Sequence, residues 1–132
     1  MSTPAEIGLA RWHALVASQD PSGLREMIAE DAVFRSPAVH RPQEGRDLVQ
    51  LYLTGAINVL GPTLSYADEW VRERDAILEF TANLDDLEVS GIDRITWDED
   101  GQIVAFTVMV RPVSALNRLI EKMGAELSRL AG

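Results

Sequence analysis

The fold of this chain is decided by one stretch, Gly91-Ile-Asp-Arg-Ile-Thr-Trp97, Asp98-Glu-Asp-Gly101, Gln102-Ile-Val-Ala-Phe-Thr-Val-Met-Val-Arg-Pro112. Two runs rich in β-branched and aromatic residues flank an Asp/Gly cluster, which is typical of two strands joined by a tight hairpin. Because side chains alternate between the two faces of a strand, Asp93 shares a face with Ile95 and Trp97. A carboxylate among apolar neighbours must find a partner, remain protonated or line a wet cavity. The sequence therefore makes Asp93 the centre of any chemistry.

Upstream of this hairpin the sequence predicts three helices and three further strands. The expected helices cover residues 5–18, a segment that begins at Asp20-Pro21, and residues 46–60. The expected strands cover residues 32–36, 64–72 and 76–84, and Gly91 suggests a bulge or a bend in the strand that follows them. Helices placed before a mostly antiparallel sheet indicate an α+β fold. We expect a curved sheet whose three helices form a cone-shaped pocket.

A final helix is expected over about 113–130. Its apolar stripe consists of Leu116, Ile120, Met123, Leu127 and Leu130. Such a stripe most often packs on its own domain, and the alternatives are a lid over the pocket or part of a dimer contact. The 132 residues have the length of one domain, so we expect a single domain over residues 1–132.

Composition limits the classes of partner. The net charge of −9 argues against nucleic acid and against anionic membrane surfaces, because both need clustered Lys and Arg. No apolar run approaches the roughly 20 residues that span a bilayer, and the N-terminus has no signal-peptide pattern. The absence of cysteine excludes disulfides and thiolate chemistry and fits a cytoplasmic protein.

The order of elements resembles the nuclear transport factor 2-like superfamily and, within it, the SnoaL-like proteins. The matching features are Asp20-Pro21 followed by Leu24, the strand start Glu30-Asp31-Ala32-Val33-Phe34, Gly45-Arg46, and Gly91-Ile92-Asp93 followed by Asp100-Gly101-Gln102-Ile103. The resemblance covers residues 5 to about 111 and leaves the final helix outside the common core. It implies the fold more specifically than the function, because this superfold hosts isomerases, cyclases, epoxide hydrolases, dehydratases and non-catalytic binders.

Ketosteroid isomerases of the same superfamily use a tyrosine on the first helix, an aspartate base after the first strand and a protonated aspartate on a later strand. By motif, these positions correspond to Trp12, Ser36 and Asp93. The Trp12 indole can still donate a hydrogen bond, but Ser36 cannot act as an unassisted base at neutral pH. SnoaL-like cyclases also resemble this chain in an acid/base aspartate near Asp93, so the resemblance leaves that role to Asp93.

We therefore expect Asp93 to be the catalytic acid/base group, unless it is a structural carboxylate held by an arginine or a backbone N–H. The candidates for substrate contact are Trp12, Phe34, Ser36, His40, Tyr52, Trp70 and Met109. The aromatic residues and Met109 are alternatively plain core, and His40 is alternatively an ordinary loop histidine. The two histidines have no ligand spacing with the carboxylates, so we expect neither a metal nor a cofactor.

The predicted function is binding of an apolar or aromatic small molecule, with cofactor-free isomerisation, cyclisation or hydration by acid/base catalysis. The alternative is a non-catalytic binding or assembly module, in which Asp93 would lie in a structural salt bridge. A row of apolar residues is expected to cover the second face of the sheet and to form a homodimer contact. These residues are Val104, Phe106, Val108 and Val110.

Overall fold

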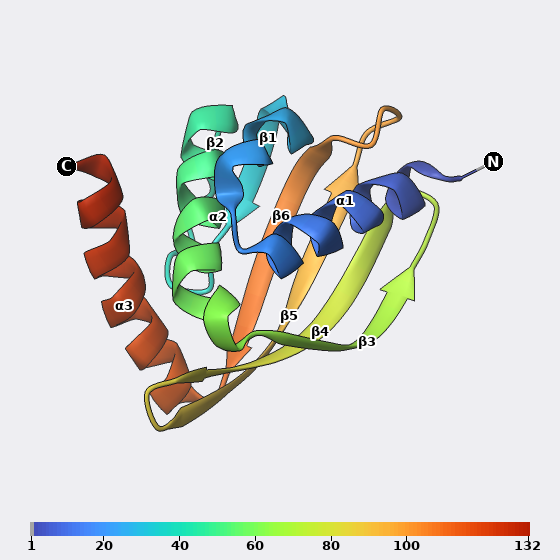
Figure 1. Ribbon diagram of the computed structural model, residues 1–132. Helices are drawn as coiled ribbons and strands as arrows, with labels where there is room; N and C mark the ends of the chain where they lie inside the picture. The colour runs from blue at the N-terminus through green and yellow to red at the C-terminus, as the bar shows by residue number, and fades with distance from the viewer. Residues whose placement is uncertain (1) are drawn as a thin grey trace.

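The computed structural model describes residues 2–132 as a six-stranded sheet with its helices gathered on one side (Figure 1). The helices are α1 (Pro4–Ser18), α2 (Arg46–Leu60) and α3 (Val113–Ala131), with 3₁₀ turns η1 (Pro21–Gly23), η2 (Arg25–Met27) and η3 (Gly61–Thr63). The strands are β1 (Ile28–Arg35), β2 (Gln43–Glu44), β3 (Ser65–Val71), β4 (Asp75–Leu84), β5 (Leu87–Trp97) and β6 (Ile103–Arg111). The predicted α+β fold is confirmed.

The sheet has the strand order β2-β1-β6-β5-β4-β3. Strands β3 to β6 form the expected antiparallel meander, and β1 joins its far edge by parallel pairing with β6. The register runs unbroken through Gly91, so the bulge expected there is absent. A Cβ at Gly91 would lie 2.6 Å from Phe80 Cζ and 2.5 Å from the Met109 carbonyl oxygen. The glycine is therefore needed for close packing of three strands rather than for a bulge.

The helical segment expected from Asp20-Pro21 is present as the two 3₁₀ turns η1 and η2. The Asp20 carboxylate caps η1 by accepting a hydrogen bond from the Ser22 N–H at 3.0 Å. The chain then enters β1 already at Ile28, four residues earlier than the sequence indicates. The early start of the strand leaves no room for a longer helix.

The prediction that the apolar row of β6 covers the second face of the sheet, away from the helices, is wrong. Pairing of Ile95 with Phe106 and of Asp93 with Val108 places the two β6 residues on the same face as Asp93, beneath the helices. Phe106 and Val108 are buried there, whereas Met109 points to the opposite face and is 56% exposed. The sequence predicts correctly that side chains alternate along β6. Which of its residues lie beneath the helices depends on the register between β6 and β5.

Helix α3 packs along α2, which agrees with the expectation that its stripe packs on its own domain (Figure 1). A Cβ at Gly55 of α2 would lie 3.2 Å from Met123 Cε and 3.4 Å from Leu127 Cδ2, so the glycine lets the two helices approach closely. The first half of α3 is tied to the β4–β5 turn by Arg118 and Lys122, which both pair with Asp85. Among residues 2–132 no helix is long and apolar enough to cross a membrane.

Gly8 of α1 provides a test of the packing between this helix and the sheet. A Cβ at Gly8 would lie 2.2 Å from Nε1 of Trp97, whose side chain is buried in the core. Gly8→Ala is therefore expected to lower the free energy of unfolding by about 1–3 kcal/mol, because the indole must move within a packed core. The matched control is Gly23→Ala, where no atom lies within 4 Å of the added Cβ. Urea unfolding measures both changes, and equal effects would contradict the contact.

Candidate active site

Asp93 lies in the middle of β5 with apolar residues on both sides. Its partners across the sheet are Leu78 on β4 and Val108 on β6, and both are buried. Asp93 itself is only 7% exposed, and it is the only charged residue among the buried residues of 2–132. No lysine, arginine or histidine of residues 2–132 forms a salt bridge with it. The geometry is that of an isolated carboxyl group in an apolar wall.

A chain of hydrogen bonds from α1 and β3 ends on this carboxyl group. The Trp12 indole N–H donates to the Tyr66 hydroxyl oxygen at 2.9 Å, and the Tyr66 hydroxyl donates to Asp93 Oδ2 at 2.8 Å. His13, which pairs with Glu69, packs edge-on against the Tyr66 ring with the centroids 5.2 Å apart. Burial and the nearby Asp93 raise the pKa of Tyr66 well above its usual value, so the hydroxyl remains a neutral donor.

Burial raises the pKa of Asp93 to about 7, while the hydrogen bond from Tyr66 acts in the opposite direction. Both protonation states are therefore present near neutral pH, which suits a general acid or base. Oδ1 of Asp93 has no hydrogen-bond partner among residues 2–132. It is nevertheless not a fully buried atom, because Trp97 Nε1 is the only fully buried side-chain nitrogen or oxygen without a partner in these residues. Oδ1 must therefore be open to the adjoining cavity.

That cavity has a volume of about 200 Å³ and lies between the sheet, α2 and α3. The lining comes from the sheet and from all three helices, and it includes several aromatic side chains. The Phe106 ring lies 5.0 Å from Trp12 and 6.0 Å from Phe34, and Phe34 lies 5.5 Å from Tyr52. Among residues 2–132, Asp93 is the only Asp, Glu, Lys, Arg or His in the lining. The cavity is thus an apolar chamber with one carboxyl group in its wall.

The structure brings five of the eight candidate residues together around this cavity. They are Trp12, Phe34, Ser36, Tyr52 and Asp93. Ser36 also accepts a hydrogen bond from the Ala38 N–H at 2.9 Å, which shapes the loop at the end of β1.

The other three candidates, His40, Trp70 and Met109, do not line the cavity. His40 is exposed in the β1–β2 loop. A register shift between Tyr66 and Glu69 turns Trp70 to the outer face, where it pairs with Ile77 and is 56% exposed. Met109 lies on the same outer face, opposite Ile92. The expectation that these three residues contact a ligand in the pocket is corrected accordingly.

Sequence reasoning missed Tyr66 and the contribution of α3. The α3 residues in the lining are Leu119, Ile120, Met123, Gly124 and Leu127. The apolar stripe of this helix could have indicated the contribution of α3, because a lid over the pocket was one of the alternatives for the final helix. Tyr66 gave a weaker signal. The register shift in β3 that places Tyr66 and Trp70 on opposite faces of the sheet cannot be recognised in the sequence. Within residues 2–132 no three His, Asp or Glu side chains gather as a metal site.

The protonation state of Asp93 can be tested through stability. The folded-state pKa of about 7 lies above the reference of 3.8, so between these values the folded protein keeps a proton that the unfolded chain releases. The contribution of Asp93 to stability is therefore fully present below about pH 4 and is lost as the pH rises to about 7. Asp93→Asn cannot ionise, so its free energy of unfolding relative to wild type should rise by about 2–4 kcal/mol between pH 5 and pH 8.

Urea unfolding at the two pH values measures this difference. Asp31→Asn, at an exposed position on β1, is the matched control, and a trend of equal size in it would mean that the effect is not specific to Asp93. An Asp93→Asn difference that is the same at both pH values would mean that Asp93 is ionised throughout in the folded protein.

Comparisons with known proteins agree with this geometry. A family model described as the SnoaL-like domain matches residues 9–106. A steroid delta-isomerase from Pseudomonas aeruginosa is 41% identical, with a TM-score of 0.92 over 100% of this chain and 98% of that chain. An uncharacterised protein with a cystatin-like fold from Silicibacter pomeroyi is 31% identical, with a TM-score of 0.82 over 89% of this chain and 83% of that one.

A more distant structure shares the fold alone. It is an epoxide hydrolase/cyclase-like enzyme of pyran ring formation in salinomycin, 19% identical, with a TM-score of 0.65 over 81% of this chain and 90% of that chain. A comparison with the sequences of curated proteins finds no significant match. The family model spans most of the chain and two solved structures exceed 30% identity, so this chain belongs to the SnoaL-like domain family, with the nuclear transport factor 2-like fold.

Proposed function

We propose that the chain binds a neutral apolar or aromatic small molecule in the cavity and that Asp93 transfers a proton to or from it without a cofactor. The observation that carries the proposal is the free Oδ1 of a carboxyl group whose pKa is about 7, in an otherwise apolar chamber. When Asp93 is protonated, the bond from Tyr66 to Oδ2 leaves the proton on Oδ1, directed toward the ligand. When it is ionised, Oδ1 is the base.

The lining supports proton transfer by a single group. Ser36 stands at the position that corresponds by motif to the base of ketosteroid isomerases, and among residues 2–132 no second carboxylate lines the cavity. In an isomerisation Asp93 would take a proton from one carbon of the ligand and return it to another. In a cyclisation or hydration it would protonate one oxygen and later recover the proton. In each case the proton is conserved over one turnover.

The lining also supports a class of ligand. A carboxylate or phosphate ligand would enter without a compensating lysine or arginine and beside the Asp93 oxygens, so it would be disfavoured. Flat neutral molecules would instead contact the rings of Trp12, Phe34 and Phe106. The likeness to the steroid delta-isomerase from Pseudomonas aeruginosa supports isomerisation of a steroid as the first reaction to test.

The alternative is a binding module of the same fold without catalysis. A structural salt bridge of Asp93 would have favoured it, and Asp93 has instead a neutral partner, Tyr66. A carboxyl group with an open oxygen supports the enzyme, although a binder could use the same group to hold a ligand carbonyl. Proton transfer itself distinguishes the two.

The test compares wild type with Asp93→Asn and with the surface control Asp31→Asn. The assays are steroid isomerisation and exchange of ligand C–H protons with D₂O, beside binding of a neutral ketosteroid. Proton transfer should fall by about 10²–10⁴ in Asp93→Asn, while binding persists. The wild-type exchange rate should rise with pH through about 7, because the protonated carboxyl cannot accept a proton. Undiminished exchange in Asp93→Asn would remove the catalytic role, and binding without exchange in wild type would favour the binding module.

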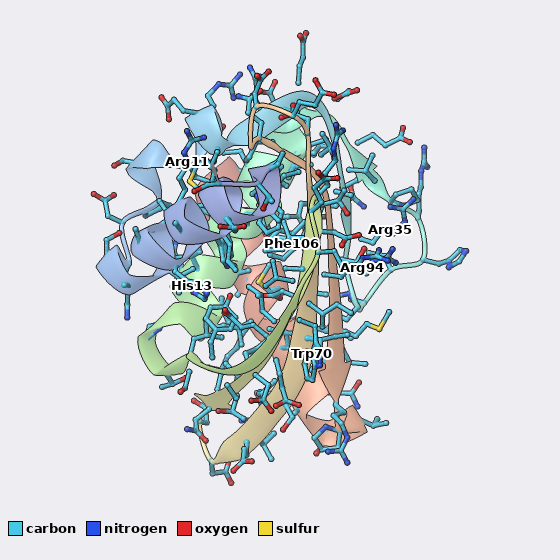
Figure 2. The ribbon with its side chains drawn as sticks, turned by 90° about the vertical axis from the view of Figure 1, so that its right-hand side faces the viewer. Arg11, His13, Arg35, Trp70, Arg94 and Phe106 are labelled. Atoms are coloured by element: carbon cyan, nitrogen blue, oxygen red, sulfur yellow. The ribbon has the colours of Figure 1, made fainter. Side chains whose placement is uncertain are left out.

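We also propose that the chain forms a homodimer through the outer face of the sheet, the face opposite the helices. Trp70 and Met109 are each 56% exposed there. Arg35 and Arg94 flank Thr107 on the same face, and Figure 2 shows them on the side of the sheet away from α1. Glu79 lies one row further along, opposite Ile92. A two-fold axis could therefore place the arginines of one copy against Glu79 of the other.

Light scattering at micromolar concentration measures this association. Met109→Glu should convert the dimer to a monomer, because it buries a charge in the centre of the apolar contact. Leu48→Glu is the control, since Leu48 is 41% exposed on α2, away from the sheet face. A wild-type protein that is monomeric under these conditions would contradict the proposal.

A further inference from the structure

The cavity opens to solvent between the β1–β2 loop and α3. Ten of its 21 lining residues are buried, whereas Val39 of the loop is 48% exposed and Ile120 of α3 is 41% exposed. Gly124, four residues after Ile120 and therefore on the same side of the helix, is exposed and also belongs to the lining. Large apolar side chains that face both the cavity and solvent mark its rim. The mouth is thus bounded by Val39, Ile120 and Gly124.

Gly124 has no local reason to be a glycine. It lies inside a 19-residue helix, where glycine is less favourable than alanine because its backbone loses more conformational freedom on folding. Gly55 of α2 is explained by packing, because its missing Cβ makes room for Met123 and Leu127. At Gly124 no atom of residues 2–132 lies within 4 Å of an added Cβ. A side chain at this position would therefore enter open space, at a residue that also lines the cavity.

The helix that carries Gly124 is held on both sides of it. Before Gly124, Arg118 Nη1 lies 2.7 Å from Asp85 Oδ2. After it, Asn58 Nδ2 of α2 donates to Glu126 Oε2 at 2.8 Å, and Arg129 holds the same carboxylate. A larger side chain at residue 124 should therefore narrow a fixed mouth rather than push the helix away.

We propose that Gly124 is a specificity-determining residue whose missing side chain sets the width of the molecule that can pass between Val39 and Ile120. This inference rests on the proposed binding of a ligand in the cavity. It adds the route by which a flat, neutral ring system enters the cavity. It also assigns to α3 the selection of ligands by width, which Asp93 does not perform.

The experiment uses the full chain and a neutral fluorescent probe, N-phenyl-1-naphthylamine, in stopped-flow binding. The variants Gly124→Ala, Gly124→Leu and Gly124→Phe form a series of increasing side-chain volume. The association rate should fall along this series, by about tenfold or more for the phenylalanine variant. Binding of the smaller probe naphthalene should be slowed less. Ala125→Phe is the matched control, because Ala125 is exposed on the same helix and does not line the cavity.

The outcomes separate this inference from the proposed function. Wild-type association rates in Gly124→Phe, with the probe displaced by a ketosteroid, would overturn the role of Gly124 and leave ligand binding intact. A wild-type protein that binds neither probe would overturn both. Melting curves show whether each variant is folded. If Gly124→Phe fails to fold, the comparison of Gly124→Ala with Gly124→Leu decides, and equal rates would reject the inference.

Discussion

The site depends on keeping a carboxyl group in an apolar wall without a counter-charge. Asp93 is tolerated there because one of its oxygens accepts a hydrogen bond from Tyr66, whose own oxygen accepts one from Trp12. An unpartnered buried polar group costs about 1–3 kcal/mol, so this chain of donors is also a structural requirement. It links α1, β3 and β5, which are distant in sequence, and it holds the helix over the sheet at the point where the chemistry would occur. Stability and the proton-exchanging group therefore rest on the same three side chains.

The two faces of the sheet carry different kinds of side chain, because of a register shift in β3 and strict alternation in β6. The shift between Tyr66 and Glu69 lets the first part of β3 serve the cavity and the second part present Trp70 on the outer face. On β6, strict alternation separates Phe106, which packs against Trp12, from Met109, which faces outward. The cavity therefore stays small and apolar while the opposite face keeps a mixed apolar and charged surface. One sheet in this way lines an apolar cavity with one face and presents a mixed apolar and charged surface with the other.

Much of the architecture follows from local patterns, and the failures have two causes. The meander, α1, α2 and α3, and the buried position of Asp93 each depend on periodicity within one segment. The faces of Met109 and Trp70 depend on how one strand is aligned with the next, which no single segment encodes. His40 lies in a loop, where no periodicity restricts the direction of a side chain. Tyr66 was missed for the first reason, since its partnership with Asp93 crosses β4 to reach β5. Sequence patterns thus located the acid but not the donor that supports it.

The parallel pairing of β1 with β6 has a consequence for the order in which the protein folds. Ile28 pairs with Ile103 and Phe34 with Phe106, so this edge joins residues from the two ends of the sheet's sequence. Contacts over such long separations form slowly, because the intervening chain must first be ordered. The antiparallel meander of β3 to β6 has short connections and can assemble earlier. During synthesis β1 can therefore complete its pairing only after β6 has been made, and the cavity becomes complete only after α3 has been made as well.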